Sequence, residues 1–154
     1  MRDLEQAASY LEQALSLVAP GTPRWGRLAS NLGNAQVALF RATGRRAALP
    51  RARELFEDAA QVLDDPADHA ACLSNLAACL QELHEQTGEN RFLDEAIAVF
   101  RDTVNDPAES AVPERRQNYG VCLLTRFKRY QSPEDLDQAI AQFQEAARTS
   151  RRAA

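Results

Sequence analysis

Cysteine and histidine side chains are the residues of this chain with the clearest potential for metal or nucleophilic chemistry. The sequence contains three cysteines, Cys72, Cys79 and Cys122, and two histidines, His69 and His84. His69 and Cys72 are three residues apart and could reach one metal ion from a helix, but a structural zinc site needs four ligands. Cys72 and Cys79 are seven residues apart, which places them on one apolar helix face, where a free cysteine behaves as a small hydrophobic residue. We therefore expect free thiols that pack in the core and no bound metal.

Motifs of the common enzyme classes are absent from the sequence. It contains no G-x-S-x-G nucleophile elbow, no phosphate-binding loop, no dinucleotide-binding G-x-G-x-x-G and no H-E-x-x-H zinc motif. Acidic pairs occur at 64–65 and 134–135, where predicted helices start, and carboxylates at such positions stabilise a helix N-terminus. Ser132 with Asp135 additionally resembles a capping box. The sequence therefore predicts that the chain is not an enzyme and has no cofactor.

The composition is that of a globular protein. Of 154 residues, 45% are hydrophobic, 26% are charged and 6% are aromatic, and the formal net charge is −4. The acidic excess argues against a nucleic-acid backbone as the main partner. The basic clusters at 45–53 and 126–129 are interpreted as solvated helix ends, because few aromatic residues accompany them. No apolar run reaches the roughly 18 residues of a membrane span, and the acidic first residues lack the apolar stretch of a signal peptide. We expect a cytoplasmic protein without membrane or nucleic-acid partners.

Two segments recur along the chain at nearly constant spacing, which is the signature of a repeat protein. The segment around Asn31 (LASNLGNA) returns around Asn75 (CLSNLAAC) and more weakly around Asn118 (RRQNYGVC), so these asparagines lie 44 and 43 residues apart. A second segment of type Leu-x-x-Ala begins at four leucines spaced by 45, 44 and 43 residues, namely Leu4, Leu49, Leu93 and Leu136. The chain is therefore predicted to contain three repeats preceded by half a repeat.

Both segments have the apolar periodicity of helices, with hydrophobic residues at i, i+3, i+4 and i+7 and no sustained strand alternation. Gly44 and Gly88 stand where helices would end, and capping side chains precede proline at Thr22–Pro23, Asp65–Pro66, Asp106–Pro107 and Ser132–Pro133. Pro113 is tolerated in a helix that begins near Ser110. These signals predict seven helices, at about 2–18, 22–43, 47–63, 66–86, 90–104, 108–130 and 133–149.

Each predicted helix has an apolar stripe that it cannot bury alone, so neighbouring helices must stack. Antiparallel helix pairs that stack in this way form an α-solenoid. The spacing predicts one domain over 1–154, with a half-repeat at 2–18 and repeats at about 22–63, 66–104 and 108–149. The last helix keeps the internal apolar pattern at Leu136, Ile140 and Phe143, whereas solenoid ends are normally polar. We therefore expect either a stretch of a longer array or a module that associates end to end.

The recurring residues resemble the tetratricopeptide repeat family. The first helix of each repeat carries a small residue at Gly33, Ala77 and Gly120, and the second helix carries an alanine followed four residues later by Phe56, Phe100 and Phe143. The resemblance implies an all-α, right-handed solenoid in which small residues let two helices approach and a ring fills the gap between pairs. The period of 43–45 residues exceeds the usual 34. The chain is in this respect more similar to kinesin-light-chain-like repeats and to long bacterial repeat arrays.

The resemblance also implies a concave binding face formed by the first helices. It assigns to that face Arg27, Ser30, Asn31, Asn34, Ser74, Asn75, Gln81, Glu114, Gln117 and Asn118. An asparagine amide offers two donors and an acceptor, so a ladder of Asn31, Asn75 and Asn118 could bond the backbone of an extended peptide. The alternative is that these amides bond a neighbouring helix or loop and hold the repeat geometry. Binding of chaperone tails is disfavoured, because Ser30, Glu114 and Asn118 stand where that subclass has cations.

Two functions remain open from the sequence, and RNA binding through the basic clusters is a third, more distant one. The main expectation is an interaction module that binds a protein or peptide on the concave face. The alternative is a structural or self-assembling repeat segment that regulates a catalytic domain elsewhere, because similar bacterial arrays often flank a caspase-like protease or a regulatory ATPase domain.

Overall fold

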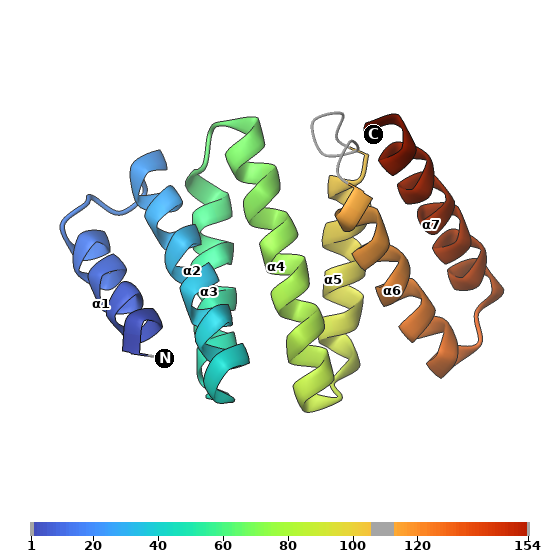
Figure 1. Cartoon of the computed structure of the whole chain (residues 1–154), viewed down its shortest axis with the longest axis horizontal. Coiled ribbons are helices and arrows are strands. Elements are labelled where there is room, and N and C mark those ends of the chain that lie inside the picture. The colour runs from blue at the N-terminus through green and yellow to red at the C-terminus, as the bar shows by residue number, and fades with distance from the viewer. Residues whose placement is uncertain (1, 106–112, 154) are drawn as a thin grey trace.

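The structure, a computed structural model, describes residues 2–105 and 113–153 and is entirely helical within them apart from connecting turns. Within these residues seven helices follow one another (Figure 1), namely α1 (Arg2–Ser16), α2 (Pro23–Thr43), α3 (Ala48–Val62), α4 (Pro66–Thr87), α5 (Asn90–Thr103), α6 (Pro113–Tyr130) and α7 (Pro133–Ala153). The predicted helices are confirmed, although α1 ends earlier and α7 ends later than predicted. The predicted start of the sixth helix at 108, with its cap at 106–107 and Ser110, lies outside the described residues.

The helix boundaries follow the capping signals of the sequence. At the start of α2 the Thr22 hydroxyl accepts a hydrogen bond from the Trp25 amide at 3.2 Å. At the start of α4 the Asp65 carboxylate accepts one from the Asp68 amide at 3.0 Å. Helix α4 ends before Gly88, whose φ of 72° lies in the left-handed region that residues with a Cβ atom rarely adopt. These caps fix where α2 and α4 begin and where α4 ends, and so fix which side chains of the two inner helices share a face.

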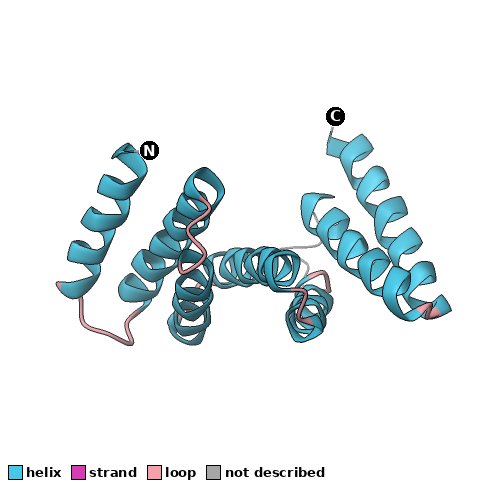
Figure 2. Cartoon of the chain, turned by 90° about the horizontal axis from the view of Figure 1, so that it is seen from below, coloured by secondary structure: helices cyan, strands magenta, loops and turns pink. Residues whose placement is uncertain are grey.

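The helices stack into an arch with two layers. Each helix packs on the next along the chain. In addition, Cα atoms of α2 and α4, and of α4 and α6, approach to within 8 Å, whereas no Cα pair of α3 and α5 does. The first helices of the repeats, α2, α4 and α6, therefore form the inner layer, with α3 and α5 behind them (Figure 1). Figure 2 shows that both ends of the chain rise on one side of the arch. This arrangement is an α-solenoid, as predicted.

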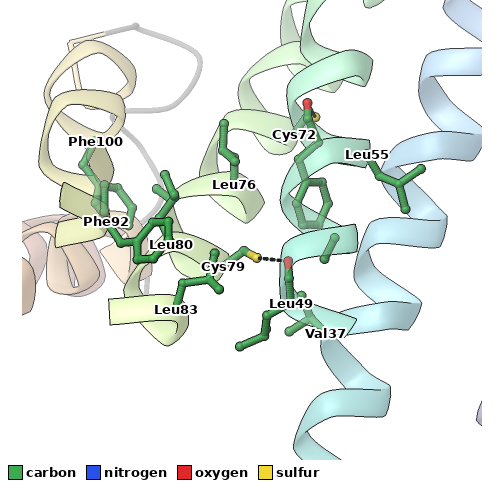
Figure 3. Close-up of a cluster of buried hydrophobic side chains, with 14 of the residues drawn as sticks. Val37, Leu49, Leu55, Cys72, Leu76, Cys79, Leu80, Leu83, Phe92 and Phe100 are labelled. Carbon is green, nitrogen blue, oxygen red and sulfur yellow. Dashed lines mark hydrogen bonds between the residues drawn. The ribbon is translucent and has the colours of Figure 1, made fainter. Parts of the chain in front are cut away.

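The hydrophobic core runs between the two layers (Figure 3). Its largest fully buried side chains include Phe56 of α3, Leu80 of α4 and Phe100 of α5. Burial of one such side chain contributes about 2–3 kcal/mol relative to leaving it in water. Each helix pair therefore depends on its neighbours, because the side chains between α3 and α4 or between α5 and α6 are buried only when the pairs stack.

Two glycines allow the closest approach between the helices of a pair. A Cβ atom on Gly33 would lie 2.7 Å from the ring of Phe56, and one on Gly120 would lie 2.7 Å from the ring of Phe143. These glycines carry no side chain, so each phenylalanine ring lies directly against the backbone of the facing helix. The predicted pairing of small residues with rings is confirmed at these two positions.

The three cysteines are free and buried. The Cys72 thiol donates to the carbonyl of Phe56 at 3.3 Å, and the Cys79 thiol donates to the carbonyl of Leu49 at 3.5 Å (Figure 3). Burial raises the pKa of Cys79 to about 12 and the pKa of Cys122 to about 12. All three side chains are therefore neutral thiols at physiological pH that serve in packing, as predicted.

Over the described residues, no helix combines the length and apolarity that crossing a membrane requires.

Candidate functional site

A furrow of about 340 Å³ lies on the inner layer between the first halves of α2 and α4. Its lining residues come from both helices and from the connection that follows the outer helix α3, and they are Arg27, Ser30, Asn31, Asn34, Leu63, Asp68, Ala71 and Asn75. We refer to this surface as the α2–α4 furrow. It is the place where the predicted binding residues gather most densely.

Helical periodicity explains why these residues share one surface. On α2, positions 27, 30, 31 and 34 are separated by three or four residues and lie on one face, while Ala29, Leu32 and Gly33 point to the buried side. On α4, positions 68, 71 and 75 follow the same spacing, with Cys72 and Leu76 buried behind them. Each inner helix therefore buries its apolar stripe and leaves a polar stripe on the concave side.

The asparagine amides of the furrow make no hydrogen bond to other described residues. Asn31 and Asn34 are exposed and Asn75 is half-buried. In the part of the chain that the structure describes, no hydrogen bond joins their side chains to another residue. The interpretation that these amides bond a neighbouring helix and hold the repeat geometry therefore receives no support from the contacts of these three residues.

One ion pair crosses the furrow. Arg27 of α2 lies 3.5 Å from Asp68 of α4, and both side chains are about half exposed. Such an exposed pair contributes at most about 1 kcal/mol to stability. Both partners therefore remain available to charged groups of a ligand at little cost to the fold.

A second furrow, of about 380 Å³, lies farther along the same helices. Its lining residues are Phe40, Arg41, Ala78, Gln81, Glu82, Glu85, Gln86 and Asn118. Here Arg41 of α2 pairs with Glu82 of α4, and the Cys122 thiol donates to the Gln81 amide oxygen at 3.6 Å. This end of the concave side is richer in acidic groups than the first furrow.

The structure divides the predicted binding residues into three groups. Arg27, Ser30, Asn31, Asn34 and Asn75 share the α2–α4 furrow, and Gln81 and Asn118 share the second furrow. Ser74, Glu114 and Gln117 line neither furrow. The predicted asparagine ladder is therefore split, because Asn118 lies at the second furrow and not beside the other two.

Several lining residues were missed by the sequence analysis. Asp68 and Ala71 could have been found, because they stand two turns and one turn, respectively, before Asn75 on the same face of α4. Glu85 could have been found in the same way from Gln81. Leu63 could not, because it belongs to the connection after α3 and its place at the furrow depends on how α3 packs.

The structure corrects the interpretation of one residue in each of two charged segments, although Lys128 and Arg129 are exposed in the last turn of α6 and Glu134 lies in the first turn of α7, as expected. Arg126, assigned to a solvated helix end, has a side chain only 23% exposed and forms a bidentate pair with Asp135 at 2.8 and 2.6 Å, with Asp94 at 3.2 Å. Asp135 was assigned to helix capping, but its carboxylate is buried against Arg126, and the Ser132 hydroxyl bonds Glu134 instead. The hydrogen bonds that Arg126 donates to the Asp135 carboxylate raise the pKa of Arg126. These residues join α5, α6 and α7 in a structural ion bridge.

Metal-ligating side chains do not gather in the described residues, where no group of three or more His, Cys, Asp or Glu is placed to hold an ion. His69 and Cys72 are the pair that the spacing in the sequence singled out. The Cys72 thiol donates a hydrogen bond to the Phe56 carbonyl and so points into the core.

Comparison with known proteins gives no family. No protein-family model matches the sequence, and no curated protein matches it. Among solved structures, the chain is similar to the crystal structure of a de novo designed helical repeat protein, with 20% sequence identity and a TM-score of 0.45 over 98% of this chain and 81% of that one. The helical repeat architecture itself follows from the stacked helices described above.

Proposed function

We propose that this chain is a non-catalytic interaction module of the tetratricopeptide type that binds a peptide, or an extended segment of a protein, along the α2–α4 furrow. The observation that carries the proposal is the set of amides at Asn31, Asn34 and Asn75, which have no hydrogen-bond partner within the described residues. An amide both donates and accepts, so it can bond a peptide backbone whatever the side chains of the peptide are.

The dimensions of the concave side fit a short extended peptide. From Arg27 to Arg41, the inner face of α2 extends about 21 Å, given a helical rise of 1.5 Å per residue. An extended chain advances about 3.3 Å per residue, so about six peptide residues would span both furrows. The small side chains of Ala71 and Ala78 leave room for a backbone to approach α4.

The test is selection of peptides from a random octapeptide library displayed on phage, with the full chain as bait. Variants of the chain in which Asn31, Asn34 and Asn75 are all replaced by alanine should bind the selected peptides at least about tenfold more weakly, since three hydrogen bonds are lost. The matched control is Gln61→Ala, which removes an exposed amide from the outer helix α3.

Fluorescence anisotropy with synthetic copies of the selected peptides measures the affinities. Equal affinity of the triple variant and the parent chain would contradict the proposal, as would an equal loss on Gln61→Ala. Far-UV circular dichroism verifies that each variant keeps its helical content.

A second candidate function is assembly through the outer side of α7, as a structural repeat segment. Ile140 of α7 is 46% exposed, whereas Ile97, at the corresponding position of α5, is 1% exposed beneath α6. Light scattering over a range of concentrations tests this function, because Ile140→Glu should abolish any concentration-dependent increase in mass. A mass independent of concentration in the parent chain would exclude it.

A further inference from the structure

A third hollow, of about 450 Å³, lies where α1 meets the first half of α2. Four apolar side chains form most of its wall, and the complete lining is Ala14, Leu17, Val18, Arg24, Arg27, Leu28 and Asn31. We refer to it as the α1–α2 pocket. Because Arg27 and Asn31 also line the α2–α4 furrow, the pocket adjoins the end of that furrow.

The side chains at this junction are more exposed than those at the corresponding junction of the next repeat. Between α3 and α4, the equivalent positions are filled, with Ala59 and Cys72 at 0% exposure and Leu63 at 8%. Between α1 and α2, the corresponding Ala14, Val18 and Leu28 are only half-buried.

The connections at these junctions differ in length. Residues 17–22 link α1 to α2, whereas only 63–65 link α3 to α4. Helix α1 ends at Ser16, and Leu17 in the following turn is 86% exposed. An apolar hollow lies beside the longer connection, at a place where the next repeat has a closed core.

The charged groups at the pocket are all basic. Arg24 is exposed and forms no ion pair with another described residue. Arg27 forms an ion pair with Asp68, which lies on the side of the α2–α4 furrow. No acidic residue lines the pocket itself. Arginine presents a planar fork of donors that matches a carboxylate. An apolar wall beside two arginines is complementary to an apolar side chain next to a carboxylate.

We propose that the α1–α2 pocket takes an apolar side chain of the bound peptide and that a carboxylate beside this side chain pairs with Arg24 and Arg27. The inference rests on the proposed function and specifies the ligand, which is an acidic peptide with an aliphatic anchor. The anchor enters between Leu17 and Leu28, and the rest of the peptide continues into the α2–α4 furrow.

The experiment uses the same octapeptide library with the full chain and with two variants of its charge. Arg24→Glu keeps the pair between Arg27 and Asp68, and it places an acidic residue in the first turn of α2, where the helix tolerates it well. The double variant Arg24→Glu with Arg27→Glu reverses the charge of the pocket completely. The control is Arg46→Glu, which makes the same charge change at an exposed residue in the turn between α2 and α3.

The expected result is enrichment of an aliphatic residue next to Asp or Glu among peptides selected by the parent chain. The double variant should bind these peptides about tenfold more weakly and should select Lys or Arg in place of the acidic residue. Arg46→Glu should select the same peptides as the parent. Synthetic peptides with a free or an amidated carboxyl end show whether the carboxylate is that of a side chain or of the chain end.

Two outcomes would overturn the inference separately from the proposed function. Selected peptides that depend on the three asparagines but show no aliphatic–acidic pair would refute the ligand class alone. The ligand class would also be refuted if the double variant Arg24→Glu with Arg27→Glu selected peptides with the same aliphatic–acidic pair as the parent chain. If no peptide depends on the asparagines, the proposed function fails and the inference fails with it.

Discussion

Replacing the buried ion pair of the third repeat by the apolar pair of the second repeat should preserve stability, whereas either single replacement should reduce it. Arg126 of α6 and Asp135 of α7 occupy the positions that Leu83 of α4 and Phe92 of α5 hold one repeat earlier. Leu83 is 4% exposed and Phe92 is 5% exposed, and both belong to the core. The same place in the fold is thus filled by hydrophobic contact in one repeat and by charge in another.

The magnitudes follow from what each change leaves buried. The Asp135 side chain is 7% exposed, so Arg126→Leu leaves a buried carboxylate without its bidentate partner and should cost about 2–4 kcal/mol. Asp135→Phe should lower the free energy of unfolding by only about 1–2 kcal/mol, because Arg126 keeps its ion pair with Asp94 and its guanidinium can reach solvent. The double variant buries no unpaired charge, and its free energy of unfolding should lie within about 1 kcal/mol of the parent value.

Urea denaturation followed by circular dichroism at 222 nm measures these differences, and the double-mutant cycle should give a coupling energy of at least about 2 kcal/mol. The control is Arg148→Leu, which breaks an exposed pair with Glu145 on α7 and should cost under about 0.5 kcal/mol. The reasoning would be refuted by additive single effects, or by a loss in the double variant as large as that in Arg126→Leu.

Three further predictions concern the core and the caps. Gly33→Ala should destabilise the chain by about 1–2 kcal/mol in thermal denaturation despite the better helix propensity of alanine, because the new Cβ would lie 2.7 Å from the Phe56 ring; an unchanged melting temperature would contradict the close approach. The raised pKa of Cys79 and Cys122, about 12 in the folded chain against an ordinary 9.0, means that the folded state holds these protons more tightly. Their stabilising contribution is therefore complete below about pH 9 and is lost as the pH rises toward 12. Urea titrations at pH 8 and pH 10.5 should show this fall, and it should be smaller when both cysteines are replaced by alanine. Gly88→Ala should cost about 1 kcal/mol, since the φ of 72° disfavours a Cβ atom, and a chain with no measurable loss would show that the cap tolerates it.

The repeat spacing was sufficient to predict the helices and their stacking, because most of the apolar and small residues that recur are those that the fold buries or half-buries. The four leucines spaced by 43–45 residues open the second helices, and Leu49 and Leu93 are each 1% exposed. Gly33 and Gly120 could be assigned to close helix contacts for the same reason. Local signals such as the Thr22 cap depend on neighbouring residues alone, so they too are readable from the sequence.

The binding surface was only partly predictable, because it depends on how far helices continue and how they tilt. Asn118 recurs with Asn31 and Asn75 in the sequence, yet the curvature places it at a different furrow. Leu17 was assigned to the first helix, whereas the structure ends α1 at Ser16 and places Leu17 at a pocket. Arg126 was misjudged because its charge suggested exposure, although its alignment with the buried Leu83 indicated an interior position.

The separation of α3 from α5, while α4 contacts both α2 and α6, has a mechanical consequence. Neighbouring repeats are joined by α3 on α4 and by α5 on α6, and the inner helices add direct contacts that the outer helices α3 and α5 lack. We therefore expect the outer side of the arch to resist bending less than the inner side. A ligand that separates α2 from α4 would rotate the helices from α4 to α7 relative to α1 and α2. Such a rotation would produce its largest displacement at α7, which lies farthest from α2 (Figure 1). A pair of fluorophores on α1 and α7 would therefore register occupancy of the concave side as a change in energy transfer.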